Sequence, residues 1–445
     1  MRLRSSRFAR DDILSFHFTS LDTAVSLVVA SSIVVKEPKD NVTLEEALTT
    51  IRQSVPLLGT KSVDIASARG SVLRQDVISD VDYPTADVSA ADGYCFRASD
   101  VSAASADTPY TLLIRGTVMA GETPSFNLQP GECAQVMSGA VLPGGADAVV
   151  RVEDVTVTKD GAAISRPVRR WSAVRRTGEV TRKGNVILKE GVMVSSAVLG
   201  LLSAVCDGRI LLSERPRVGV LATGDELIPP DTRPAPGQTR SSNAAMLLAL
   251  ADELGLPVFD AGISRDSESD LVRRIETCAD CDAVILTGGT AAGRHDLVPA
   301  ALERVGAETI FRGLLMRPGR HMLLAKQGGN LYMGLPGNPV GCFVLFHMIV
   351  RPALLAMMGA KHMIPVPFTR SWAGPDHSKP DVRVFTPGRL VENSGVEPVG
   401  SRDSADVVSL ATADCLVSLA EGISEVKHGQ PVDVFTLGGT PWFDK

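Results

Sequence analysis

The central part of the chain, residues 216–362, consists of short apolar runs separated by segments of helical spacing. The runs VGVLAT and DAVILTGG are short and almost continuously apolar, which is typical of buried strands. Segments between such runs, for example SSNAAMLLALADELG, start with Ser or Asn and end at Gly, as helices do. Strands that alternate with helices at this spacing predict a doubly wound, mainly parallel α/β sheet with helices on both faces.

The flanking regions have other patterns. Residues 42–56 have helical spacing, with Thr43 as the expected N-cap and Glu46 at the position of a capping box. Short apolar runs between Gly, Pro and Asp turns indicate additional β-rich domains, so the predicted fold class is α/β plus β-rich. The predicted parts are an N-terminal extension (1–40), a linker or dimerisation domain (41–82 and 184–213), a β-rich domain (83–183), the α/β domain (214–362) and a β-barrel-like domain (363–445).

Composition narrows the class of protein. Of the 445 residues 44% are hydrophobic and 22% are charged, as in soluble globular proteins. The net charge of −6 argues against a general nucleic-acid binder, which needs a basic face to displace counterions from phosphates. No apolar stretch looks long enough for a membrane span, so we expect a cytoplasmic protein without a membrane partner.

Two local features have an ordinary explanation and a functional one. Residues 1–40 place arginines before an apolar run, but Asp11, Asp12 and Asp22 interrupt the order of a signal peptide. A disordered extension or a misplaced start codon is preferred. Cys278 and Cys281 form the one close cysteine pair, and without a second pair of ligands reduced thiols are favoured over a zinc site.

Glycines and polar residues follow the predicted strands where the strands end. Ligands of open α/β sheets bind at these carboxyl ends. The residues predicted on this basis to bind substrate are Thr223, Gly224, Asp225, Thr287, Gly288, Gly289, Pro336, Gly337 and Asn338. The carboxylates expected at the same edge, besides Asp225, are Glu226, Asp266 and Asp296.

Glycine turns and carboxylates together favour an anion pocket that uses a cation. A backbone without Cβ can approach an anion and direct N–H groups at it, and the following helices add the positive ends of their dipoles. Mg²⁺ commonly lies between carboxylates and substrate phosphates. Taken singly, each turn is as well explained as a tight turn and each Asp as an N-cap. No G-x-G-x-x-G follows a strand and no P-loop motif occurs, so dinucleotide and P-loop sites lose their main support.

Basic partners for an oxyanion come from the segment MRPGRH. Arg317 and Arg320 flank its Pro-Gly turn. Each guanidinium could form charge-assisted hydrogen bonds worth about 1.5–3 kcal/mol. A solvated surface turn is the alternative.

Several segments occur together, in order, from about Val42 to the C-terminus. They are SAADGYCFRASD, GECAQVMSGAVLPGGADAVV, VLATGDEL, LTGGTAAGRHD, MRPGRH and GLPGNPVG. This set resembles the molybdopterin molybdenumtransferase family, whose members include the C-terminal domain of gephyrin. The resemblance implies a homodimer of four-domain subunits, with the active site between the α/β domain of one subunit and the β-rich part of its partner.

The resemblance also implies a reaction and its residues. The substrate would be adenylylated molybdopterin, into which molybdate is inserted with release of AMP and with help from Mg²⁺; other proteins of molybdenum cofactor biosynthesis are candidate partners. The implied catalytic residues are Asp92, Glu226, Asp266 and Asp296, the last three also as metal ligands. Ser138 stands where the family usually has a substrate-binding Thr. The implied molybdate pocket comprises Arg317, Pro318, Arg320, Gly341, Arg383 and Ser404.

The chain departs from the family pattern at several of these positions. Arg317 and Arg320 replace lysines, which keeps the charge but exchanges a compact ammonium for a planar fork. The other departures are His321 for Pro, Gly341 and Ala291 for Ser, and Val180 for Asp. Lost hydroxyl donors affect catalysis more than binding, because a barrier depends on donors placed for the transition state.

Three hypotheses follow from the resemblance and its departures. The first is an active molybdenum insertase, the second a non-catalytic paralogue that binds a pterin or serves as a scaffold. The third is an enzyme with a changed oxyanion or metal preference. AMP release that depends on Mg²⁺ and molybdate separates the first from the second, and competition among molybdate, tungstate and sulfate tests the third.

Overall fold

The central sheet of the α/β domain has seven strands in the order β1-β19-β21-β22-β18-β14-β17. The computed structural model describes residues 39–290, 297–364, 366–375, 377–378, 382–392, 394–400, 405–422 and 425–437. The strands are β1 (Lys39–Val42), β14 (Val218–Thr223), β17 (Val258–Ser264), β18 (Ala283–Thr287), β19 (Glu308–Leu314), β21 (Leu323–Gln327) and β22 (Asn330–Leu335). Four of the six neighbouring pairs are parallel, which confirms the predicted sheet type.

Two strands of this sheet were not expected from the pattern. Strand β21 runs antiparallel to both β19 and β22, so the sheet is mixed at this end. Strand β1 pairs with β19 in parallel and includes Lys39 and Asp40, so the predicted extension of residues 1–40 overlaps a strand of the sheet. The rest of that extension lies outside the described residues.

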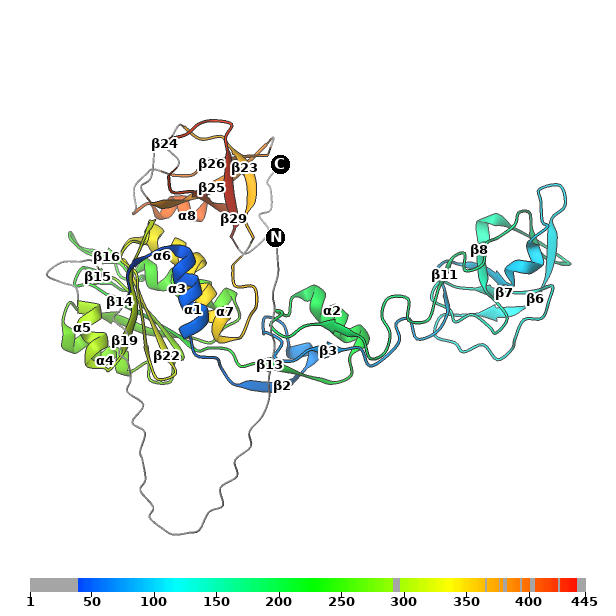
Figure 1. The fold of residues 1–445 in the computed structure, drawn as a ribbon, viewed down its shortest axis with the longest axis horizontal. Helices are drawn as coiled ribbons and strands as arrows, with labels where there is room; N and C mark the ends of the chain where they lie inside the picture. The colour runs from blue at the N-terminus through cyan, green and yellow to red at the C-terminus, as the bar shows by residue number, and fades with distance from the viewer. Residues whose placement is uncertain are drawn as a thin grey trace, which may run out of the picture. The chain divides into compact units, whose positions relative to one another are not determined.

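Helices cover both faces of the sheet (Figure 1). They are α1 (Leu44–Ser54), α3 (Ser242–Glu253), α4 (Glu268–Glu276), α5 (Leu297–Arg304), α6 (Pro339–Leu345) and α7 (Arg351–Met357). Side chains alternate along the strands: Val220 and Ile285 pack with α1, α3, α6 and α7, whereas Leu221 and Val284 pack with α4 and α5. The sheet is therefore buried on both sides, as its continuous apolar runs predict.

The first helix follows the sequence rule that predicted it. Thr43 is the N-cap of α1, its side chain accepts from the Glu46 N–H at 3.2 Å, and the Glu46 carboxylate accepts from the Thr43 N–H at 2.9 Å. This reciprocal pair is the predicted capping box.

Helices α6 and α7 are joined by the π-helical turn η4 (Phe346–Val350). The whole segment, Pro339–Met357, is long and apolar enough to cross a membrane by length and composition alone, so the expectation that no stretch reaches that length is wrong. In the structure 78% of its most apolar window is buried against the protein, as in a core helix.

Three smaller structural parts complete the described chain. The linker domain pairs β2 (Thr60–Asp64) with β13 (Arg209–Ser213) and β3 (Val77–Ile78) with β12 (Val186–Leu188), and contains η1 (Ile65–Ser67) and α2 (Ser196–Val205). The β-rich domain has a six-stranded sheet, β8-β5-β7-β6-β10-β9. Its elements are β4 (Val88–Ser89), β5 (Gly93–Phe96), η2 (Ala98–Val101), β6 (Tyr110–Val118), β7 (Glu132–Val136), β8 (Ala148–Arg151), η3 (Val152–Asp154), β9 (Val155–Thr158), β10 (Gly161–Ile164) and β11 (Val174–Arg175).

The C-terminal strands close on themselves. Strand β27 (Cys415–Leu419) pairs with β29 (Pro431–Thr436) and with β25 (Arg383–Val391), while β26 (Gly395–Pro398) and β23 (Phe368–Trp372) complete the ring. The remaining elements are β20 (Met316–Arg317), β24 (His377–Ser378), α8 (Val407–Ala411) and β28 (Glu425–Val426). The strands therefore form a closed ring, in the order β25-β26-β23-β29-β27.

Cys278 and Cys281 are buried at the end of α4, against Gly219 of β14. A Cβ built on Gly219 would lie 3.2 Å from both sulfur atoms. Burial raises the pKa of the Cys278 thiol to about 11. Because an apolar site disfavours the thiolate, these side chains act as small core residues.

Candidate functional site

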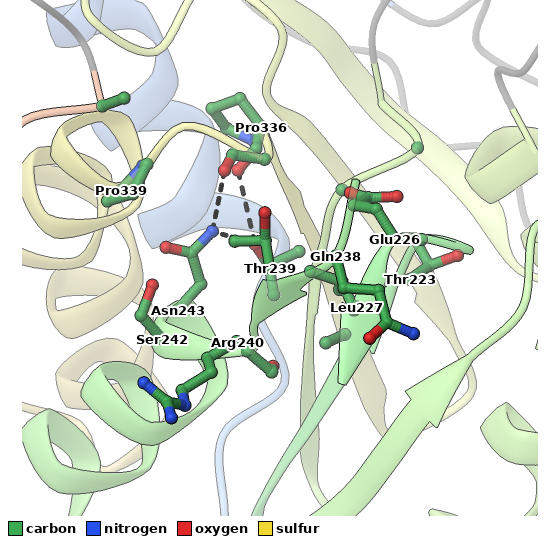
Figure 2. Close-up of a pocket in the computed structure, with 18 of the residues that line it drawn as sticks. Thr223, Glu226, Leu227, Gln238, Thr239, Arg240, Ser242, Asn243, Pro336 and Pro339 are labelled. Carbon is green, nitrogen blue, oxygen red and sulfur yellow. Dashed lines mark hydrogen bonds between the residues drawn. The ribbon is translucent and has the colours of Figure 1, made fainter. Parts of the chain in front are cut away.

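The carboxyl ends of four neighbouring strands, β22, β18, β14 and β17, meet at one edge of the sheet because the strands are mutually parallel. A cavity of about 920 Å³ lies at this edge (Figure 2). Among the predicted site residues, those that line it are Thr223, Gly224, Glu226, Asp266, Thr287, Gly288, Gly289, Pro336 and Gly337. The four strand ends therefore converge on one cavity, which these nine predicted residues line.

Two carboxylates reach the cavity from adjacent strand ends. The Asp266 carboxylate, after β17, accepts weak hydrogen bonds from Thr223 Oγ1 and from the Asp225 N–H, both at 3.4 Å. Glu226 follows β14 by three residues and lies over Gly224, where a Cβ would come within 2.7 Å of both Glu226 carboxylate oxygens. Gly224 thus leaves room for the Glu226 side chain at the rim.

The Thr-Gly-Gly turn after β18 packs directly on the end of β14. Gly288 has φ +93°, and a Cβ at this position would lie 2.4 Å from the Thr223 carbonyl oxygen. Its N–H donates to the Leu335 carbonyl at the end of β22, at 3.1 Å. Only glycine fits both the backbone angle and the space, so this residue joins three strand ends.

A side-chain network under the cavity connects α3 to two of the turns. The Asn243 Nδ2 group donates to Thr287 Oγ1 at 3.1 Å and to the Gly337 carbonyl at 2.9 Å (Figure 2). The Cys342 thiol donates to the Pro336 carbonyl at 2.9 Å. Burial raises the pKa of the Cys342 thiol to about 12, so the proton stays available for this bond. The network holds the turns after β18 and β22 together.

Three buried polar atoms around this cavity have no hydrogen-bond partner within the described part of the chain. They are Ser241 Oγ, Asn243 Oδ1 and Thr290 Oγ1, and all three residues line the cavity. Buried polar groups are nearly always paired, since leaving one unpaired costs about 1–3 kcal/mol. These three atoms are therefore available to hydrogen-bond with a ligand in the cavity.

Two residues predicted to bind substrate do not line the cavity, and their side chains instead accept hydrogen bonds from backbone N–H groups. Asn338 is the N-cap of α6, where its Oδ1 accepts from the Gly341 N–H at 3.0 Å. The Asp225 carboxylate accepts from the Asp266 N–H at 3.3 Å. For these two side chains the structure supports the alternative reading of strand-end polar residues as caps and turn anchors.

Asp92 and Ser138 lie together, but in the β-rich domain. The Asp92 carboxylate accepts from the Ser138 N–H at 2.7 Å. Neither residue lines the 920 Å³ cavity.

The described residues among those assigned to molybdate do not line that cavity either. Arg317 ends β20 and precedes Pro318 through a cis peptide bond. Arg383 begins β25, beside Met316 of β20, and its Nη1 forms an ion pair with Glu45 at 2.6 Å. Arg320 lines a separate cavity of about 350 Å³, which shares Thr290 with the larger one. Asp296, Ala291 and Ser404 lie outside the described residues.

Gly341, where the family has Ser, lies in the first turn of α6. A Cβ at Gly341 would lie 3.0 Å from Pro336 Cγ, so a serine here would need the turn to shift by a few tenths of an ångström. The glycine is thus matched to the position of the Pro336 ring.

Sequence reasoning missed one side of the cavity. The strands β15 (Leu227–Ile228) and β16 (Thr239–Arg240) form a parallel pair after β14, and they lead into α3. This excursion brings Gln238, Thr239, Arg240, Ser241, Ser242 and Asn243 to the cavity. The available signal is Ser-Ser-Asn at the start of a helix, a pattern that by itself predicts only an N-cap.

Comparison with protein families assigns almost the whole described chain. Residues 42–206 match "MoeA N-terminal region (domain I and II)", residues 219–356 match "Probable molybdopterin binding domain", and residues 373–437 match "MoeA C-terminal region (domain IV)". The second of these matches contains all four converging strand ends.

Individual proteins give the same result. The chain is 32% identical to a molybdopterin molybdenumtransferase of Nostoc sp. (85% of this chain, 89% of the relative) and 30% identical to one of Staphylococcus aureus (90% and 97%). Two solved structures of molybdopterin biosynthesis MoeA proteins from Pyrococcus horikoshii superpose with TM-scores of 0.70. They are 30% and 25% identical, and the superpositions cover 90% and 89% of this chain and all of theirs.

Proposed function

Because the chain belongs to the MoeA family of molybdopterin molybdenumtransferases, we propose that it binds adenylylated molybdopterin in the 920 Å³ cavity and transfers molybdenum to it from molybdate, releasing AMP. One observation carries this proposal. Four adjacent strand ends place three glycine-containing turns and two carboxylates around one cavity, within the region that matches the molybdopterin-binding family. Such a site suits a phosphorylated ligand.

Mg²⁺ fits the donors at this rim. Glu226 and Asp266 are oxygen donors on adjacent strand ends and line the same cavity. Mg²⁺ is usually held by one or two carboxylates together with substrate phosphates, so the lack of a three-residue cluster in the described part of the chain is compatible with it. When bound, the ion would neutralise phosphate charge during hydrolysis of the adenylate. Asp296 is proposed as a further ligand from the family pattern alone.

Molybdate is proposed to bind near Arg317, Arg320 and Arg383. Register supports the grouping of two of these, because β20 and β25 are neighbouring strands and Arg383 is paired with the residue before Arg317. Guanidinium groups bind tetrahedral oxyanions through forked N–H donors. Competition among molybdate, tungstate and sulfate measures the selectivity of this set.

A homodimer is proposed to complete the site with Asp92 and Ser138 of a second copy. These two residues are joined by a 2.7 Å hydrogen bond in the β-rich domain and do not line the cavity of their own α/β domain. The linker domain offers an apolar surface for self-association. Ile78 and Val186 are cross-strand neighbours, and both are about half exposed.

The decisive experiment combines binding with turnover. Titration calorimetry with adenylylated molybdopterin should give saturable binding, and added Mg²⁺ and molybdate should then release AMP. The variant Glu226→Gln keeps the size of the side chain but loses the charge, and we expect turnover to fall by about 10²-fold or more. The control, Glu253→Gln, removes the same charge at the exposed end of α3 and should behave as wild type. AMP release unaffected by Glu226→Gln would contradict the proposed role.

The alternative function is a molybdopterin-binding protein without turnover. The specific observation in its favour is that Arg383 is paired with Glu45 while Gly341 lacks the hydroxyl of the family's Ser. On this alternative, adenylylated molybdopterin binds tightly, binding survives Glu226→Ala, and AMP never appears above background.

A further inference from the structure

The N-terminus of α3 forms part of the cavity wall. Helix α3 has 12 residues, and Ser242 and Asn243 at its start line the cavity. The first-turn N–H groups of a helix lack intrahelical acceptors and carry the positive end of the helix dipole. This end of the cavity therefore offers donors to an anion.

The N-cap residue of α3 is unsatisfied. Ser241 makes no side-chain cap hydrogen bond, only 5% of its surface is exposed, and its Oγ has no partner within the described part of the chain. An N-cap serine usually satisfies a first-turn N–H with its oxygen. Ser241, Ser242 and Asn243 line the cavity, so the Ser241 hydroxyl and the first-turn N–H groups are available to an anion bound there.

Arg240 adds a formal charge beside the same helix end. Its Nε donates to the Thr232 carbonyl at 2.9 Å, which holds the stem in place. The Arg240 Nη atoms make no hydrogen bond to another described residue, and Arg240 is exposed and among the residues that line the cavity. A guanidinium next to a helix N-terminus is suited to a phosphate oxygen.

The two sides of the cavity thus differ in charge. Figure 2 shows Arg240, Ser242 and Asn243 on one side and Glu226 with Thr223 on the other. On the Glu226 side, where Asp266 also lies, a phosphate needs a cation because two carboxylates repel it. On the α3 side no acidic side chain lines the cavity among the described residues, so an anion can bind directly.

We propose that Arg240, Ser241 and the N-terminus of α3 form a metal-independent phosphate subsite that holds a phosphate of the adenylylated substrate. This inference rests on the proposed function for the identity of the ligand. The Ser241 hydroxyl and the first-turn N–H groups would donate to the phosphate oxygens, and Arg240 would add a charge-assisted bond.

The test uses AMP as the probe, in EDTA and without divalent cation. Wild-type protein should bind AMP in calorimetry, more weakly at higher ionic strength because the contact is electrostatic. Loss of the charged donor in Arg240→Gln should weaken AMP binding by about tenfold, and Ser241→Ala by about threefold to tenfold. Arg240→Lys should retain part of the affinity, and adenosine, which lacks the phosphate, should bind all the proteins alike.

Matched controls separate this subsite from general effects. Ser267→Ala removes an N-cap hydroxyl that also makes no cap bond, at α4 and outside the cavity lining, and Arg233→Gln removes a charge from the same loop as Arg240. Both should bind AMP as wild type does. Failure of wild type to bind AMP without a cation, or equal AMP affinity in Arg240→Gln, Ser241→Ala and wild type, would overturn the proposal. Thermal melts identify misfolding, and a misfolded Arg240→Gln leaves Ser241→Ala to decide.

The outcome is independent of turnover. If wild-type protein binds AMP in an Arg240-dependent way but never releases AMP from the adenylylated substrate, the proposed transferase reaction fails and the subsite stands. If turnover occurs and the Arg240 and Ser241 variants bind AMP normally, the proposed subsite fails and the transferase reaction stands.

Discussion

At the scale of single residues, the cavity depends on positions where only one residue type fits. Gly288 combines φ +93° with a Cβ position 2.4 Å from the Thr223 carbonyl oxygen. Asn243 supplies two donors to groups on different turns. The Thr-Gly-Gly motif indicates Gly288 from the sequence alone. The role of the Asn243 side-chain amide is apparent only in the structure, where both of its acceptors can be located.

Replacement of Gly288 should separate backbone strain from steric conflict. We expect Gly288→Ala to lower the free energy of unfolding by more than the roughly 1–2 kcal/mol that a left-handed backbone costs an L-residue, because the methyl group also meets the Thr223 carbonyl. The control is Gly328→Ala, at φ +56° with nothing within 4 Å of the added Cβ. Urea unfolding of both variants measures the difference. Equal losses would mean that the close contact is unimportant.

At the scale of elements, the largely apolar helical segment from Pro339 to Met357 contains two buried or partly buried basic residues, His347 and Arg351. His347 lies in the π-helical turn, with its ring edge-on to Phe343 at 4.7 Å, and its Nε2 is buried without a partner within the described residues. Burial, and then the charge of Arg351, lower the pKa of His347 to about 4. A histidine that is neutral in the folded core destabilises the fold when it must bind a proton.

The lowered pKa predicts acid sensitivity of a definite sign. Between pH 6.5 and about 4 the unfolded chain binds a proton at His347 that the folded protein does not, so stability falls as the pH falls through this window. The contribution is at most about 1.4 kcal/mol per pH unit. Urea unfolding at pH 7 and pH 5 should show a smaller pH effect for His347→Gln than for wild type. Identical pH slopes would rule out this residue as a source.

Some elements around the cavity can be predicted from the sequence, and others cannot. The capping box of α1 and the strand ends of the central sheet follow from neighbours in sequence, so their pattern predicted them. The parallel pair β15 and β16 consists of strands of two residues each, and a hydrophobic period cannot be detected in so short a segment. It nevertheless positions Arg240 and Ser241 at the cavity.

At the scale of the whole molecule, the proposed reaction uses residues from two domains, and those of the β-rich domain are not among the residues that line the cavity. Asp92 and Ser138 belong to the β-rich domain, whereas Glu226 and Asp266 belong to the α/β domain. Self-association through the linker domain is the proposed solution.

A charge placed on the apolar surface of the linker domain should break the dimer. Ile78 is 54% exposed, so Ile78→Glu leaves the fold intact but opposes burial in an interface, and sedimentation should shift toward the 47.0 kDa monomer. AMP release should fall with it. Val157→Glu changes an equally exposed residue of the β-rich domain and should leave the assembly unchanged. A dimer that tolerates Ile78→Glu would place the interface elsewhere.

The α/β fold class, the helix cap at Thr43 and the strand-end residues of the cavity can be predicted from the amino-acid pattern alone. These features are local: hydrophobic period specifies the element, and residues adjacent in the chain specify the turn. The other residues of the cavity became apparent only in the folded protein. The Asn338 and Asp225 side chains accept hydrogen bonds from backbone N–H groups and do not line the cavity. Arg317 and Arg383 do not line it either, whereas Arg240, Ser241 and Asn243 do. The physical reason is that a cavity forms between segments distant in sequence, and no local pattern encodes which side chains face it.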